Sequence, residues 1–313
     1  MIRRVLALAA AAVLAACETA VPPPQPEALP VQRPERPAAP PAEPSDNSLR
    51  AALFYRQVEQ RLLTEGLLRQ DGGGDDTPFD ADTLSRNFER IALFSEYVQI
   101  GGRYVAQQSR AALRRWKSPV RFQLHFGESV DPDIRTADTQ RIRAYVARLR
   151  RVTGHPMSLV TQGGNYHIFV TNVDELADLG PEITAVEPAL PRQTVSEITS
   201  LGQSTYCAVY ASSTANDPNA YVSALAIIRA EHPDLMRLAC YHEEMAQGLG
   251  LANDSPRARP SIFNDDEEFA LLTGHDELLL QMLYDDRLSI GDTAEEARPI
   301  IRQIAEGLVG GST

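Results

Sequence analysis

Histidine is scarce in this chain of 313 residues, and none of its six histidines stands at a spacing typical of metal ligands. Cysteine occurs three times, and aromatic residues make up only 6% of the sequence. The formal net charge is −12 and acidic residues are spread along the chain, which argues against a nucleic-acid partner. No internal repeat is present, and beyond the N-terminal region no apolar stretch is long enough to cross a bilayer. These absences predict a folded body outside the membrane.

The N-terminus has the pattern of an export signal. After two arginines, a short apolar run ends in the letters LAAC at Cys17. The run is too short to span a bilayer, and small residues precede the cysteine. Residues 1–16 resemble the signal peptide of a bacterial lipoprotein, which implies that Cys17 carries a lipid such as palmitate. Glu18, where an inner-membrane retention signal would have aspartate, favours the outer membrane facing the periplasm. An ordinary signal cut near Ala16 is the alternative.

The rest of the chain divides by composition. Residues 17–47 are predicted to be a linker, because prolines recur from Val21 to Pro44 and such a stretch forms an extended tether. The remaining residues, 48–313, are long enough for one large domain. Within it we expect N-terminal helices up to residue 117, a lobe of sheet and helix over 118–250, and a mostly helical lobe over 251–313.

Hydrophobic periodicity predicts an α+β fold with a mixed sheet and packed helices. Alternation with period two predicts strands, and amphipathic stripes predict helices. Strands that alternate with a helix, ahead of a helical end, are typical of this fold class. The predicted strands are 120–126, 157–161, 166–171, 205–210 and 222–229, and the predicted helices are 49–68, 82–97, one that ends at Trp116, 136–153, 234–249, 273–284 and 294–308.

Residues 241–254, YHEEMAQGLGLAND, place polar side chains on one predicted helix. Glu243 and Gln247 are one turn apart, and Glu244 follows the first of them. A metal-binding helix needs ligands at i and i+4, with a glutamate beside the first ligand to hold and deprotonate the metal-bound water. The three residues have this spacing, but they are not the residue types that zinc prefers.

The stretch resembles the motif His-Glu-x-x-His-x-x-Gly-x-x-His of the metzincin clan of zinc peptidases. In this register Glu244 stands at the general-base position and Gly250 at the glycine. Glu243, Gln247 and Asn253 stand where the clan has its three histidines. The resemblance implies a zincin-like fold with a cleft above the helix.

Two elements farther along the chain fit the same register. The residues Ser261-Ile262-Phe263-Asn264 resemble the methionine turn of the clan, which implies that Phe263 lies beneath the site in place of methionine. Leu272 to Tyr284 is similar to the helix that closes matrix-type metallopeptidases. Its start also has an independent physical basis, because Thr273 and Asp276 form a capping box.

The combination resembles still more closely an uncharacterised family of Gram-negative lipoproteins, a domain of unknown function, over roughly residues 80–290. Its members share an Asn-Phe-x-x-Ile-Ala helix, here 87–92. They also share Glu-Glu-x-x-Gln-x-Leu-Gly-Leu, here 243–251, and Ser-Ile-Phe-Asn-Asp, here 261–265. The resemblance implies no activity.

The donor chemistry separates two functional hypotheses. Glu243, Gln247 and Asn253, or Asp254 in its place, offer only oxygen donors, which suit calcium, magnesium or manganese rather than zinc. Such a site is a poor Lewis acid for peptide hydrolysis compared with zinc on three imidazoles. The leading hypothesis is a lipid-anchored protein whose cleft binds an envelope protein or peptide, without catalysis, metal or cofactor. The alternative is a metal-dependent hydrolase with a divalent cation and Glu244 as general base. A structural spacer is the third possibility.

The remaining cysteines give a structural prediction. In an oxidising compartment Cys207 and Cys240 should form a disulfide, worth about 3–4 kcal/mol in the chain-entropy model. The alternative is that Cys240, one turn before the glutamate pair, is a free ligand or nucleophile. His242 is expected to be a hydrogen-bonded core histidine, because its i+4 neighbour is Ala246.

Overall fold

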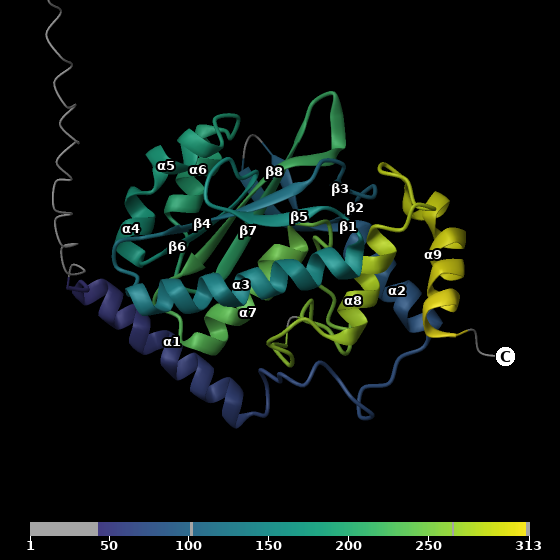
Figure 1. The fold of residues 1–313 in the computed structure, drawn as a ribbon, viewed down its shortest axis with the longest axis horizontal. Helices are drawn as coiled ribbons and strands as arrows, with labels where there is room; N and C mark the ends of the chain where they lie inside the picture. The colour runs from purple at the N-terminus through teal and green to yellow at the C-terminus, as the bar shows by residue number, and fades with distance from the viewer. Residues whose placement is uncertain (1–42, 101–102, 265, 311–313) are drawn as a thin grey trace, which may run out of the picture. The chain divides into compact units, whose positions relative to one another are not determined.

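The computed structural model describes residues 43–100, 103–264 and 266–310, which belong to one compact unit (Figure 1). The predicted signal peptide, Cys17 and most of the predicted linker lie outside these residues. In the described part of the chain, every helix is too short or too polar to cross a membrane.

A mixed sheet of six strands organises the fold. Its strands are β3 (Arg115–Trp116), β4 (Val120–Phe126), β5 (Met157–Val160), β6 (Tyr166–Thr171), β7 (Cys207–Thr214) and β8 (Asp217–Arg229). The order β5-β4-β6-β8 is parallel throughout, and β3 pairs in parallel with the start of β8. β7 pairs antiparallel with β8 and with no other described strand, so its outer edge has no strand partner.

Helices cover both faces of this sheet. Between β4 and β5 lies α3 (Pro132–Thr153), and after β8 comes α7 (Asp234–Gln247). Three short helices stand between β6 and β7: α4 (Val173–Asp178), α5 (Gly180–Val186) and α6 (Arg192–Thr199). The remaining helices are α1 (Asp46–Thr64), α2 (Ala81–Ala92), α8 (Gly274–Leu283) and α9 (Ala294–Val309). Figure 1 shows α4, α5 and α6 grouped at one end of the sheet and α2, α8 and α9 at the other.

The two faces of the central strands enter different cores, as period-two alternation requires. Ile168 and Ile228 belong to the main core, which also holds apolar side chains of α2, α3, α7, α8 and α9. Their neighbours Phe169 and Ile227 point to the opposite face and pack with apolar residues of α4, α5 and α6. All six residues of β6 are buried, as expected for a strand covered by helices on both sides.

The predicted α+β class is confirmed, and all five predicted strands occur within a few residues of their expected bounds. The helix predicted over 82–97 ends at Ala92. The helix predicted to end at Trp116 was wrong: β1 (Phe94–Ile100) and β2 (Arg103–Arg110) pair there as an antiparallel ribbon. The sequence held a hairpin signal, because Gly101-Gly102 separates two runs that each contain tyrosine and valine. Helices α4, α5 and α6 were not predicted, although Asn172 and Glu175 form a capping box.

Candidate functional site

A cavity of about 710 Å³ lies between the edge strand β7 and the helix α7. β7 lines it from Cys207 to Ala211, and α7 lines it through Glu243, Glu244 and Gln247. The described part of its wall holds five acidic residues and one basic residue, Arg114. The acidic residues are Glu197, Glu243, Glu244, Asp254 and Glu267. The sequence motif therefore lies on the wall of an acidic cleft.

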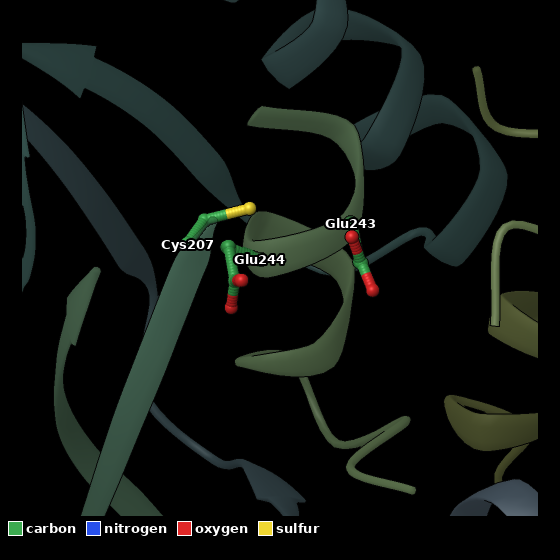
Figure 2. Close-up of side chains that lie close together, drawn as sticks. All are labelled: Cys207, Glu243 and Glu244. Atoms are coloured by element: carbon green, nitrogen blue, oxygen red, sulfur yellow. The ribbon is translucent and has the colours of Figure 1, made fainter. Parts of the chain in front are cut away.

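The glutamate pair lies next to the start of β7 (Figure 2). One carboxylate oxygen of Glu243, one of Glu244 and the Sγ atom of Cys207 all lie within 4.8 Å of one another. Glu244 is buried and Glu243 is half-buried. Three side chains of metal-ligating types thus converge here, although Cys207 is not a free thiol in this structure.

Cys207 is bonded to Cys240 of α7, with the two Cα atoms 5.9 Å apart. The predicted disulfide is confirmed, and the alternative of a free Cys240 is wrong for this structure. The bond ties β7 to α7 at one end of the cleft. It therefore helps to set the distance between the two walls.

The sequence left open whether Asn253 or Asp254 completes the site, and the structure separates them. Asp254 lines the cleft, and its Oδ1 accepts a hydrogen bond of 3.0 Å from Gln247 Nε2. Asn253 is fully buried and does not line the cleft. Its Nδ2 donates to the carbonyl oxygen of Arg90 at 2.9 Å, and its Oδ1 accepts from Gln108 Nε2 at 3.1 Å. Asn253 therefore joins the loop after α7 to α2 and β2, and its predicted place in the cleft was wrong; its alternative, Asp254, lines the cleft.

Gly250 is required by the backbone, independently of any metal chemistry. Its φ angle is +132°, a conformation that side chains disfavour. A Cβ atom there would lie 2.2 Å from the carbonyl oxygen of Arg114. The glycine of the motif thus allows the chain to pass close to the backbone just before β3.

Aromatic side chains from other elements hold the C-terminal half of α7. Four of them donate hydrogen bonds to backbone carbonyl oxygens of α7 or of the two residues that follow it, at distances between 2.5 and 3.1 Å. The bonds to Gly248 and Leu249 satisfy carbonyl groups past the end of the helix, and those to His242 and Glu244 fix the helix against α3 and β6. None of these donors was predicted from the sequence; they are Tyr145 (to His242), Tyr166 (to Glu244), Trp116 (to Gly248) and Tyr284 (to Leu249).

Replacing Gly248 by alanine is expected to lower the free energy of unfolding by about 1–3 kcal/mol, because it overpacks a filled core. The new Cβ would lie 2.1 Å from the hydroxyl oxygen of Tyr166. Urea unfolding followed by circular dichroism measures the loss. Gly307 is the matched control: it is exposed in α9, and an added Cβ meets nothing within 4 Å. Gly307→Ala should therefore stabilise slightly, and equal effects at both glycines would contradict the packing argument.

His242 is the hydrogen-bonded core histidine that the sequence predicted. Its ring stacks on Tyr145 with centroids 3.9 Å apart, and its Nδ1 accepts from the backbone nitrogen of Leu272 at 3.0 Å. Burial disfavours the charged ring and lowers the pKa of His242 to about 3. It is neutral in the folded protein and takes no part in the cleft.

This shift predicts a dependence of stability on pH. The ordinary histidine pKa of 6.5 exceeds the folded pKa of about 3, so between these values the unfolded chain binds more protons at this position. His242 should therefore lower the free energy of unfolding as pH falls, by about 2 kcal/mol between pH 7 and pH 5. Urea unfolding at both pH values, on wild type and His242→Gln, measures this contribution. An identical pH dependence in both proteins would refute it.

Phe263 is fully buried in the main core, together with Met245 and Ala246 of α7. The turn that holds it is fixed by Asp276, whose carboxylate accepts from Ser261 Oγ at 2.6 Å and from the backbone nitrogen of Ile262 at 3.0 Å. The predicted capping box of Asp276 with Thr273 is present at the start of α8. One buried carboxylate therefore links the turn to the next helix.

The chain belongs to a family described as a protein of unknown function (DUF2927), whose model matches residues 81–303. The match runs from α2 to α9 and includes the glutamate pair, Gln247, Asp254 and both cysteines of the disulfide. No curated protein and no solved structure matches the chain. The predicted membership of a domain of unknown function is confirmed.

Proposed function

We propose that this chain is a lipid-anchored protein of the bacterial envelope, held to the membrane through Cys17. Its cleft between β7 and α7 binds an extended peptide segment with basic side chains and does not cleave it. The observation that carries the proposal is the outer edge of β7, which pairs with none of the other described strands and lines the same cleft as the carboxylates of α7.

The edge of β7 suits an extended peptide. An exposed strand edge recognises a peptide by continuing the hydrogen-bonding pattern of the sheet, and adjacent pockets select its side chains. The five residues from Cys207 to Ala211 line the cleft in sequence, so a bound segment would run along them. A folded partner would present such a segment from a loop or a terminus.

The charge of the cleft favours basic side chains. Its described wall carries five carboxylate residues and a single arginine. Complementary charge across an interface speeds association and excludes partners of the wrong sign. Lysine or arginine side chains of the peptide would face Glu243 and Asp254, and acidic peptides would be repelled.

The donor set argues against hydrolysis. Glu243, Gln247 and Asp254 bring oxygen and amide groups where a zinc peptidase uses imidazoles, and the amide of Gln247 is already bonded to Asp254. A zincin-like origin of the cleft is supported by the antiparallel edge strand β7 and by the helix that follows β8. The alternative, a metal-dependent hydrolase with Glu244 as base, is favoured by the close approach of the two glutamates.

Peptide binding tests the proposal directly. Fluorescence anisotropy should detect binding of short labelled peptides that alternate lysine with serine, and the affinity should fall as salt is added. Peptides that alternate glutamate with serine should not bind. Glu243→Gln combined with Asp254→Asn should weaken binding of the lysine peptide, whereas Glu182→Gln, on the exposed face of α5, should not. Equal binding of both peptides would refute charge selection in the cleft.

Glu244→Gln separates binding from hydrolysis. The change keeps the size and hydrogen bonding of the side chain but removes the base, so a hydrolase would lose turnover and keep its fold. We expect no peptide cleavage before or after the change, and at most weaker peptide binding. Oxidised protein purified without chelator should also lack stoichiometric zinc. Cleavage by wild type that Glu244→Gln abolishes would establish the hydrolase instead.

A further inference from the structure

The disulfide and the glutamate pair form one cluster on the wall of the cleft. Cys240, Glu243 and Glu244 stand at i, i+3 and i+4 on α7, positions that share one face of a helix. Cys207 faces them from β7, with its sulfur within 4.8 Å of a carboxylate oxygen of each glutamate. Three side chains that can each coordinate a metal therefore converge between two elements, and the sulfur of Cys240 is bonded to one of them.

Metal ligands in a tetrahedral site lie a few ångströms apart, because each is about 2.0–2.3 Å from the ion. The Cys207 sulfur and one oxygen of each carboxylate lie within 4.8 Å of one another, so side-chain shifts of about 1 Å would bring them to ligand spacing. The disulfide prevents this cluster from binding a metal ion, because thiolates coordinate metals and disulfide sulfurs do not.

We propose that reduction of the Cys207–Cys240 disulfide converts this wall into a site for a thiophilic divalent metal ion such as zinc. The two thiolates and the carboxylates of the adjacent glutamate pair are its ligands. Thiolates supply the soft donors that an oxygen-only site lacks. This inference concerns the reduced chain and does not depend on peptide binding.

The reaction balances with a dithiol as reductant. The dithiol gives two electrons to the protein disulfide, whose sulfur–sulfur bond breaks, and is itself oxidised to a disulfide. Cys207 and Cys240 become thiols. The metal ion then forms two metal–sulfur bonds and displaces both thiol protons to solvent. Re-oxidation reverses the sequence and releases the ion, so metal binding and disulfide formation exclude each other.

His232 adds a ring nitrogen beside the cluster. Its Nδ1 lies 3.7 Å from the sulfur of Cys240, and its buried Nε2 has no hydrogen-bond partner among the described residues. This contact places the ring against Cys240, and we assign His232 as a positioning residue for that cysteine.

Cobalt titration tests the site. The full chain with Cys17→Ser leaves two cysteines, and the protein is compared in its disulfide form and after reduction with dithiothreitol and anaerobic removal of the reductant. Reduced protein should bind one equivalent of Co²⁺, with a sulfur-to-cobalt charge-transfer band and intense visible bands of tetrahedral cobalt. Zn²⁺ should abolish these bands. The disulfide form should show none of them.

Variants identify the ligands. Glu243→Gln with Glu244→Gln should weaken Co²⁺ binding to the reduced chain at least about tenfold, since loss of even an outer-shell partner costs 10–100-fold. Glu182→Gln, exposed on α5, should leave the affinity unchanged. Replacing His232 by glutamine should weaken binding less than the double change and keep the charge-transfer band. Equal affinities for wild type and the double variant would overturn the assignment of the carboxylates.

Reduced Cys17→Ser protein that keeps its near-ultraviolet circular dichroism, has two reactive thiols and shows no charge-transfer band would overturn the proposal. Should reduction unfold the chain, Zn²⁺ is expected to restore the near-ultraviolet signal of wild type but not of the Glu243→Gln, Glu244→Gln variant, because metal binding is coupled to folding. Failure of Zn²⁺ to restore it would equally refute the site.

Discussion

Replacing Asp138 by alanine is expected to lower the free energy of unfolding by about 3–5 kcal/mol, the cost of breaking a buried ion pair. Asp138 is 1% exposed and Arg237 is 2% exposed, and the Oδ2 atom of the first lies 2.7 Å from Nε of the second. The hydroxyl of Tyr241 also donates to Oδ2, at 2.9 Å. Removal of the carboxylate leaves the guanidinium of α7 buried beside α3 with its main partner missing.

Arg237 would keep one carboxylate contact, to the exposed Asp234 at 2.7 Å, so the loss should fall in the lower part of that range. Urea unfolding followed by circular dichroism measures it. Asp133→Ala is the matched control on α3: the residue is exposed in the first turn, and its loss should amount to less than about 1 kcal/mol. A similarly small loss at Asp138 would show that the pair does not hold α7 against α3.

The glutamate pair could be predicted from the sequence because the spacing of residues on a helix is a local property. Glu243, Glu244 and Gln247 lie together on α7 and line the cleft for that reason. The residues of the site that follow the helix were predicted less well, because in a loop the direction of each side chain depends on the backbone conformation. The left-handed conformation of Gly250 precedes the point where Asn253 points into the protein and Asp254 into the cleft.

The fold shows the same division between local and distant information. The bounds of β6 were predicted without error, because an apolar run between turn signals identifies a strand from neighbouring residues alone. The aromatic donors to α7 come from β3, α3, β6 and the end of α8, far from it in sequence. Nothing in the sequence near Trp116 or Tyr166 indicates which carbonyl oxygen they will meet. Such contacts depend on the assembled fold.

Replacing Cys207 and Cys240 together by serine is expected to lower the free energy of unfolding by about 3–4 kcal/mol, because the bond closes a loop in the unfolded chain. The two residues are 33 positions apart, and this separation sets the size of the entropic term. The folded state should change as well. Among the described strands β7 pairs with β8 alone, and the disulfide cross-links it to α7.

Urea unfolding of the double variant and of reduced wild type, both without metal, should give the same loss, because both lack the same bond. Hydrogen exchange then separates the two contributions. If the bond also holds the cleft closed, amides of β7 should exchange faster in the variant under native conditions, while those of β6, buried between β4 and β8, should change only as much as global stability requires. If the variant is less stable but its β7 amides exchange no faster relative to those of β6 than in wild type, the disulfide acts through the unfolded chain alone. The width of the cleft would then be set by the sheet and by the aromatic residues that donate to α7.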